Sequence, residues 1–381
     1  MPKYKFSEIA YNITAKKMPE PGDEELYIGL EHIDSGSLRV TRWGSNVELV
    51  GQKLVMQKGD ILFGRRNTYL RRCAIAPHDG IFSAHGMIFR PNTEVIDPDY
   101  FPFFISSDYF MDAAIRISVG SLSPTVNWKT LKELEFYLPD LNQQRHMAEL
   151  LSAANDAKES YQDLLIQTDN LVKTQFIEMF GDPLNNEQNW PRKRLQDLVS
   201  SDCSISYGIV KTGDDVPGGV PVFRPVDIVG KVPAIADLKR TTAEISAQYK
   251  RTLLKGRELL ITVRANIGDT CIIGDEFTGC NVGRGIVPIR LNENIMSLEF
   301  LKGQMDFDSM SQHIKSLAKG VTLIQLNMED LRMIEFIVPP IDLQSSYVSI
   351  LHQTDKSKFA LKESIDRIND LMKSLMHQDF S

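Results

Sequence analysis

The stretch that decides the fold runs from Gln143 to Phe180 and reads QQRHMAELLSAANDAKESYQDLLIQTDNLVKTQFIEMF. It contains neither proline nor glycine, and the four- and three-residue steps of a heptad seam connect Tyr161, Leu165, Thr168, Val172 and Gln175. This spacing predicts one amphipathic helix of roughly 55 Å, at ~1.5 Å per residue. Gly181 is the expected C-terminal cap. A helix of this length needs a partner that covers its seam.

A second copy of the pattern lies 200 residues further along the chain. Its seam follows the same heptad steps at Leu361, Ile365, Ile368, Met372 and Leu375. The register also holds upstream of the helices, where Gly120, Asn127, Leu131, Glu135, Phe136, Pro139 and Gln144 recur as Gly320, Asn327, Leu331, Glu335, Phe336, Pro339 and Gln344. A register kept over this distance indicates a tandem duplication of one globular unit followed by one long helix.

Each globular unit is expected to be a mixed α+β domain with an irregular sheet. The expected strands are 27–30, 53–56, 61–63, 73–76 and 134–138 in the first unit, and 220–223, 259–263, 271–274 and 334–338 in the second. The β pattern also continues over 81–90. Helical segments are expected at 100–116 and at 298–317, with a short helix start at 127–133. The central parts of the units leave the common register by a few residues, and their loops differ. Unlike loops on a shared scaffold suggest two readers of different targets.

Length and composition are typical of a cytoplasmic protein with two or three domains. The chain has 381 residues, a net charge of −7 and four cysteines. Its first residues lack the apolar core of a signal peptide, and no run approaches the ~20 apolar residues of a membrane span. We therefore expect a cytoplasmic location, no membrane association, and reduced cysteines that are buried as small apolar residues.

Charge is segregated along the chain. Between Gln143 and Asp182 acidic residues outnumber basic ones, so the long helix is expected to be acidic. Between Ile61 and His78 there are four arginines and no acidic residue. A local basic field of this kind is compatible with nucleic-acid binding even in a chain with a negative net charge.

No catalytic site and no metal site is expected. The P-loop, HExxH and CxxC patterns are all missing from the sequence. His146 and Glu149 share one helix face but lack further ligands, so a solvated face explains them better. Val338-Pro-Pro-Ile341 lacks the polar first residue and the final aromatic of an amino-methyltransferase motif. We interpret it, together with Leu138-Pro-Asp-Leu141, as a strand-to-helix turn.

The candidate DNA-binding residues are centred on two corresponding stretches, 64–72 in the first unit and 262–268 in the second, and Lys211, Arg224, Arg284 and Lys319 could add to the second surface. Arginine contacts phosphates or takes guanine through two hydrogen bonds, and asparagine does the same for adenine. The candidates are Arg65, Arg66, Asn67, Tyr69, Arg71 and Arg72 in the first unit, and Lys211, Arg224, Arg264, Asn266, Arg284 and Lys319 in the second. Taken singly, each of these residues is explained equally well as a solvent-exposed loop residue that makes no contact with DNA. The cluster of four arginines favours binding.

These features resemble the specificity subunit of type I restriction-modification systems. The resemblance is carried by Lys58-Gly-Asp-Ile-Leu-Phe63 with the arginine-rich loop after it, by Ile205-Ser-Tyr-Gly-Ile-Val210, and by the two turns with their long helices. The second unit departs from the Lys-Gly-Asp pattern, because it has Lys255-Gly-Arg-Glu258 in the corresponding place.

The resemblance implies two target recognition domains, residues 1–142 and 182–342, each reading one half of a split site in double-stranded DNA. It also implies two antiparallel spacer helices, residues 143–181 and 343–381. The implied partners are two adenine methyltransferase subunits, which hold S-adenosylmethionine, and optionally two motor-nuclease subunits. The chain itself is then non-catalytic and carries no cofactor.

Two other functions compete with this interpretation. The first is a coiled-coil scaffold that binds proteins and has no DNA specificity, and the arginines between Arg65 and Arg72 argue against it. The second is a self-contained DNA methyltransferase, and the missing cofactor and catalytic motifs argue against that.

Overall fold

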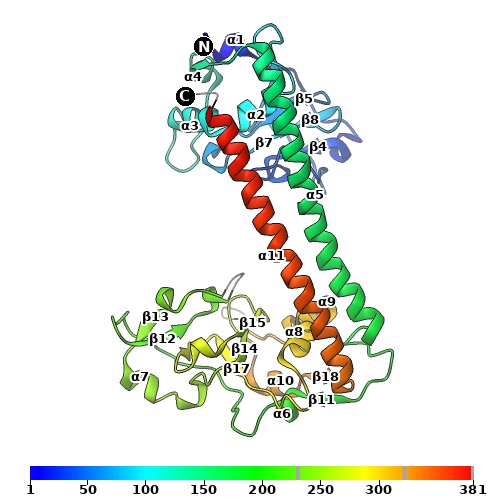
Figure 1. Cartoon of the computed structure of the whole chain (residues 1–381), viewed down its shortest axis with the longest axis vertical. Helices are drawn as coiled ribbons and strands as arrows, with labels where there is room; N and C mark the ends of the chain where they lie inside the picture. The colour runs from blue at the N-terminus through cyan, green and yellow to red at the C-terminus, as the bar shows by residue number, and fades with distance from the viewer. Residues whose placement is uncertain (229–231, 321–323, 379–381) are drawn as a thin grey trace. The chain divides into compact units, whose positions relative to one another are not determined.

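The computed structural model describes residues 1–228, 232–320 and 324–378 (Figure 1). The chain forms two compact units: Met1–Asp163 with Leu361–Ser381, and Leu164–Ala360. Each unit therefore contains one globular part and segments of both long helices, α5 (Leu141–Phe180) and α11 (Ile341–Gln378). The last three positions of the helix expected at 343–381 lie outside the described residues.

The first unit is a mixed α+β domain with two small sheets. Its short elements are β1 (Lys3–Lys5), α1 (Phe6–Ile9), β2 (Ala10–Ile13), β3 (Lys16–Lys17), η1 (Asp23–Leu26), β4 (Tyr27–Ile28), η2 (Leu30–His32), β5 (Lys53–Met56), β6 (Ile61–Phe63), η3 (Thr68–Leu70), β7 (Cys73–Ile75), β8 (Gly80–Phe82), β9 (Met87–Pro91), α2 (Phe101–Ser106), α3 (Asp108–Arg116), α4 (Trp128–Leu131) and β10 (Glu135–Tyr137). The sheets have the strand orders β2-β9-β6-β7 and β3-β5-β8-β4, and β1 pairs with β10. The strands predicted at 53–56 and 61–63 are confirmed.

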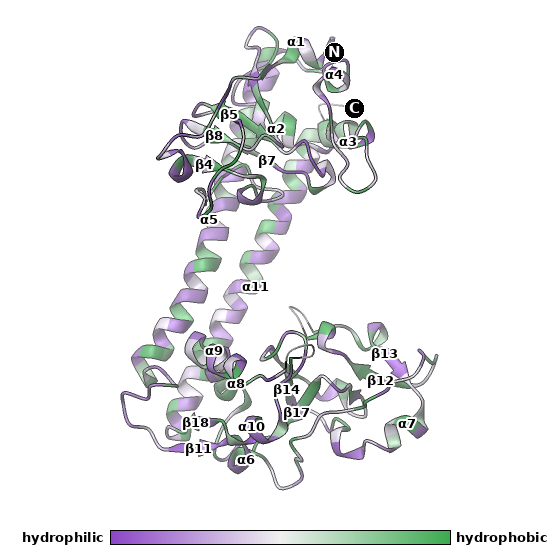
Figure 2. Cartoon of the chain, turned by 180° about the vertical axis from the view of Figure 1, so that it is seen from behind, coloured by the Kyte–Doolittle hydropathy of each residue, from purple (hydrophilic) through white to green (hydrophobic). Residues whose placement is uncertain are grey.

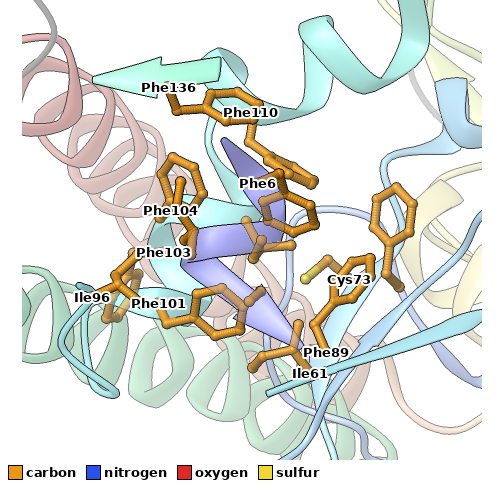
Figure 3. Packing of buried hydrophobic residues seen from close by; sticks show 14 of the residues in the cluster. Phe6, Ile61, Cys73, Phe89, Ile96, Phe101, Phe103, Phe104, Phe110 and Phe136 are labelled. Atoms are coloured by element: carbon orange, nitrogen blue, oxygen red, sulfur yellow. The ribbon is translucent and has the colours of Figure 1, made fainter. Parts of the chain in front are cut away.

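Phenylalanine rings fill the core of the first unit (Figure 3). Phe6 on α1 contacts Phe89, Phe110 and Phe136, with ring centroids 5.2, 5.0 and 6.2 Å away. These rings come from a helix, two strands and a second helix, so their burial joins segments from the whole domain. The β6 strand, which leads into the arginine-rich loop, enters this core through Phe63.

The second unit repeats the plan. Its short elements are β11 (Arg192–Arg194), α6 (Leu195–Leu198), β12 (Val220–Phe223), η4 (Pro225–Asp227), η5 (Ile235–Asp237), β13 (Lys239–Thr241), α7 (Ala243–Ala247), η6 (Lys250–Thr252), β14 (Glu258–Thr262), β15 (Thr270–Ile273), η7 (Asp275–Phe277), β16 (Asn281–Val282), β17 (Ile286–Ile289), α8 (Leu298–Asp306), α9 (Asp308–Ser316), α10 (Met328–Met333) and β18 (Glu335–Ile337). Its described sheets are β15-β14-β17 and β13-β12-β16, with β11 paired to β18. The pairs β1–β10 and β11–β18 place Tyr4 opposite Phe136 and Lys193 opposite Phe336. This matching topology confirms the duplication.

Three expected segments are confirmed in type, and each is divided in the structure. The helical segments 100–116 and 298–317 are each two helices, separated at Ser107 and at Phe307. Ser107 is extended and its hydroxyl accepts from Phe110 N, which starts a new helix. The extended Phe307 places its ring 5.5 Å from that of Phe176. The β pattern over 81–90 forms two strands, β8 and β9, which belong to different sheets and are separated by a turn in which Gly86 N donates to Ser83 O.

The long helices have the predicted seams. Every seam position from Tyr161 to Gln175 and from Leu361 to Leu375 is partly buried, whereas Leu164 and Leu171 beside the first seam are exposed. Figure 2 shows hydrophilic purple segments alternating with hydrophobic green ones along both helices. Gly181 closes α5 with a left-handed backbone (φ 74°) and donates to Ile177 O, as expected of a cap.

The two helices pack together in opposite directions. In the first unit Met147 and Leu151, near the start of α5, share a core with Met372 and Leu375, near the end of α11. In the second unit Phe176, near the end of α5, makes an edge-to-face contact with Tyr347, near the start of α11, with the ring centroids 5.2 Å apart. Because the start of each helix meets the end of the other, the predicted antiparallel arrangement is confirmed.

A buried glutamine fixes the start of each long helix to its own domain. Gln144 Oε1 accepts from Asp97 N at 2.8 Å, and Gln144 Nε2 donates to Val95 O and Pro139 O. Gln344 makes the same bonds, accepting from Ser297 N and donating to Ile295 O and Pro339 O. Both side chains are fully buried. Each one therefore provides hydrogen-bond partners inside the domain for three backbone groups.

Gln344→Leu is expected to lower the free energy of unfolding of the second unit by about 2–3 kcal/mol, because it leaves buried backbone groups without partners. Hydrogen exchange of peptides from the second unit, measured by mass spectrometry, tests this. Gln353→Leu is the matched control, since Gln353 is an exposed residue of the same helix. Equal protection in the two variants would contradict the assignment.

The cysteines are unreactive. Cys73, Cys271 and Cys280 are buried, and Cys203 is partly buried. Burial raises the pKa of all four thiols, that of Cys271 to about 11. The expected burial is confirmed for Cys73, Cys271 and Cys280, whereas Cys203 is partly buried and its sulfur accepts from Arg290 N.

Candidate nucleic-acid interface

The arginine-rich loop of the first unit is held by backbone bonds. It leaves β6 and returns as β7, which pairs antiparallel with β6. Val126 N donates to Arg65 O at 2.9 Å, and Asn67 N donates to Pro124 O at 2.7 Å. Arg66 thereby forms an isolated bridge with Thr125. The loop is fixed at its middle, with Arg66 and Tyr69 exposed.

The corresponding loop of the second unit leaves β14 and is held in the same way. Leu326 N donates to Val263 O at 3.0 Å, and Arg264 bridges Gln325. Arg264 thus takes the place of Arg66, at an offset of 198 residues instead of the 200 that relates Thr125 to Gln325. The expected correspondence of the two loops is confirmed, and so is the expected drift in register.

Both loops carry a left-handed residue directly after the bridging arginine. Asn67 has φ 54° and Ala265 has φ 60°. Asparagine tolerates this region, whereas for alanine it costs roughly 1–2 kcal/mol. Strain of this kind persists only where surrounding contacts impose it, and it clusters at functional sites. The loop conformation is therefore determined by the scaffold in both units.

Among the described residues, several candidate cations form ion pairs with acidic groups. Arg71 Nη1 lies 2.6 Å from Asp108 Oδ1, and its Nη2 contacts Asp112. In the second unit Arg224 Nη2 lies 2.9 Å from Asp227 Oδ1. Lys319 Nζ lies 2.9 Å from Asp330 Oδ2. These pairs reduce the positive potential that Arg71, Arg224 and Lys319 add to the surface.

Arg66 and Arg264 have neutral partners instead. Arg66 Nη2 donates to Ser123 Oγ at 3.2 Å, and Arg264 Nη2 donates to the side-chain oxygen of Gln325. Neither acceptor is charged, so each of these bonds holds one guanidinium nitrogen without placing an opposite charge against it. Arg65 and Arg72 are both partly buried, and Arg72 O accepts from Gly64 N at 2.9 Å at the base of the loop. Within the described part of the chain, Arg65 Nε and Asn67 Oδ1 are buried without a hydrogen bond.

The second unit has a cavity of about 240 Å³ beside Arg264. The structure brings Arg264 and Arg284 together in its lining, with Tyr207 and Gln325. Asn266 lines a separate hollow with Lys315, and Lys211 is exposed outside both linings. Tyr207 and Gln325 were missed as site residues. The signals for them were present, since Tyr207 lies within Ile205–Val210 and Gln325 repeats the position of Thr125.

The described residues contain no group of three or more metal-ligating side chains. Within the same residues, no helix is long and apolar enough to cross a membrane.

A family model described as "Type I restriction modification DNA specificity domain" matches residues 16–166 and 187–370. The two matches cover most of the chain, one on each half of the duplication. The chain belongs to this family. A type I specificity subunit is the non-catalytic, DNA-specifying component of its enzyme, and it works in a complex with other subunits.

The specificity subunit is similar to known members in sequence and in fold. It is 23% identical over 296 residues to the type I restriction enzyme EcoBI specificity subunit of Escherichia coli, a match that covers 70% of this chain and 62% of that subunit. This chain therefore spans less than two thirds of that relative's length.

Two solved structures share the fold over the whole chain. The S subunit of a type I restriction-modification system from M. genitalium has a TM-score of 0.57 at 14% identity, with 96% of that chain covered. A chain solved in work on complex assembly and conformational transition of the type I R-M system has a TM-score of 0.56 at 18% identity, with 97% of that chain covered.

Proposed function

We propose that the chain reads a split site in double-stranded DNA, one half with each globular domain. The target recognition domains are residues 1–142 and 182–342, and residues 143–181 and 343–381 are the spacer helices between them. The observation that carries the proposal is the pair of equivalent loops at Arg66 and Arg264, each of which is held by an isolated antiparallel bridge and surrounded by different residues. A shared scaffold with unlike loops suits two unlike half-sites.

The charges around the loops divide the candidates into two roles. Arg66 and Arg264 have neutral partners, so their free donors suit two-bond contacts with base edges. Arg71, Arg224 and Lys319 already face carboxylates, so they suit phosphate contacts that exchange one anion for another. Arg65, Asn67, Tyr69, Arg72, Lys211, Asn266 and Arg284 complete the proposed surface.

The proposed partners are two adenine methyltransferase subunits that hold S-adenosylmethionine, with two motor-nuclease subunits in the complete enzyme. The net charge of −7 is compatible with this assembly. Nonspecific affinity for DNA comes from neutralised phosphates, and cations of the partner subunits would add to the phosphate contacts of this chain. We place no cofactor on this chain itself.

Arg66→Ala is expected to relax one position of one half-site, and Arg264→Ala one position of the other, each at a cost of about 1–3 kcal/mol in binding free energy. Each variant is assembled with the methyltransferase subunit of the same system, and the methylated adenines are sequenced. Lys193→Ala, which removes an exposed cation from β11, is the control and keeps both half-sites.

Relaxation of both half-sites by a single variant would contradict the assignment of one domain to each half. A complex that assembles normally and selects no DNA sequence would instead favour the protein-binding scaffold.

A further inference from the structure

Gln325 joins three segments of the second unit. Its backbone pairs with Lys319 in both directions, with N–O distances of 3.0 and 2.9 Å, and it also bridges Arg264. Its side-chain oxygen accepts from Arg264 Nη2. Its side-chain nitrogen lies 3.4 Å from Asn327 Oδ1 and donates to it. The amide is therefore oriented from both ends, with the oxygen toward the arginine.

This bond constrains the guanidinium group of Arg264. An arginine side chain has five donors in one rigid plane, so a bond at one nitrogen fixes the plane and leaves other donors available. Arg264 is partly buried and lines the cavity together with Arg284 and Tyr207. The held arginine is thus prepared for a ligand that has paired acceptors, such as the O6 and N7 atoms of guanine.

The chemistry of the acceptor matters as much as its position. A carboxylate at position 325 would hold the arginine equally well but would neutralise it, as Asp227 does for Arg224. An amide oxygen holds the group and keeps its charge. In the first unit Arg66 also has a neutral acceptor, but there it is Ser123, because Thr125 takes the place of Gln325. The two domains therefore hold equivalent arginines by different side chains.

We propose that Gln325 is a positioning residue that holds Arg264 for two-bond recognition of guanine in the half-site read by the second domain. The inference rests on the proposed function and adds to it the residue that sets the specificity of Arg264. Gln325 itself does not contact the base.

The test uses the complex assembled with the methyltransferase subunit and a set of duplexes that differ at each position of the second half-site. Gln325→Met has a similar length but no acceptor, and it is expected to reduce the preference for guanine at one position about ten-fold. Gln325→Glu keeps the acceptor and is expected to keep that preference, while its added charge weakens binding to every duplex. Gln312→Met, at an exposed glutamine of α9, is the control.

The Arg264→Ala background separates positioning from other roles. If Gln325 acts through Arg264, the double variant Arg264→Ala with Gln325→Met has the same base preferences as Arg264→Ala alone. An equal loss with and without Arg264 would overturn the inference, as would an unchanged guanine preference in Gln325→Met. Loss of the preference in Gln325→Glu would also overturn it.

A failure of the proposed function itself would give a different result from a failure of this inference. In that case the unmodified complex itself shows no preference among the duplexes, and the inference falls with it. A purely structural role would lower the melting temperature of Gln325→Met and weaken all duplexes alike, which also overturns the inference.

Discussion

Phe176→Ala is expected to lower the free energy of unfolding of the second unit by about 3–5 kcal/mol, because it opens a cavity in a packed aromatic cluster. Phe176 is 1% exposed. Its ring lies 5.2 Å from Phe180, 5.6 Å from Phe300 and 5.2 Å from Tyr347. These side chains come from α5, α8 and α11, so the cluster fixes both long helices to the second domain.

The next residue along α5 provides the control. Ile177 is 50% exposed, and Ile177→Ala is expected to change stability by less than about 0.5 kcal/mol. Hydrogen exchange of peptides from each unit, measured at several denaturant concentrations, shows which unit loses stability. Phe176→Ala should release peptides of the second unit and leave the phenylalanine core of the first protected. A similar loss in both variants would show that the cluster does not anchor the helix.

Arg290→Met is expected to destabilise the second unit by about 3–5 kcal/mol, because it leaves a buried carboxylate without its counterion. Glu258 is fully buried, and its Oε1 lies 2.6 Å from Arg290 Nη1. The first unit has the equivalent pair, in which Arg90 Nη2 donates to the buried Asp60 at 3.0 Å. Asp60 directly precedes β6 and Glu258 begins β14, whereas Arg90 lies in β9 and Arg290 directly follows β17.

The double variant Glu258→Leu with Arg290→Met is expected to recover most of the loss, because it removes both charges and refills the space. pH gives an independent check. Burial raises the pKa of Glu258 above its ordinary value, and the charge of Arg290 opposes this rise, so removal of Arg290 raises the pKa of Glu258 further. In Arg290→Met the deficit should therefore grow as the pH rises through the folded-state pKa and shrink at acidic pH. A deficit that does not depend on pH, or a double variant as unstable as the single one, would contradict the pair's role.

The Glu258 pair also explains the departure from the Lys-Gly-Asp pattern. In the first unit Asp60 accepts from Gln57 N at 2.7 Å, and in the second Glu258 accepts from Lys255 N at 3.4 Å. Glutamate takes the place of aspartate on a turn of different spacing, so the acidic function is kept while the local pattern changes. A comparison of the two turn sequences shows only that their patterns differ. The contact between Glu258 and Arg290 shows that Glu258 is the equivalent of Asp60.

The sequence by itself determined the features that depend on neighbours along the chain. A heptad seam is a local period, so Tyr161 to Gln175 showed the buried stripe of α5 without any tertiary information. Gly181 was recognisable as a cap because few other residues adopt φ 74° without strain. The 200-residue repeat indicated the two-domain plan, since a duplicated pattern implies a duplicated fold.

The tertiary structure decided the features that depend on residues far apart in the sequence. Arg71 is paired because α3 brings Asp108 and Asp112 to it, and Arg264 is held because the chain returns to it at Gln325. The charge available at a cation depends on such neighbours, and a one-dimensional pattern does not contain them. For the same reason, the four arginines of one sequence stretch were indistinguishable, whereas the fold separates the acid-paired Arg71 from Arg66, which a neutral hydroxyl holds.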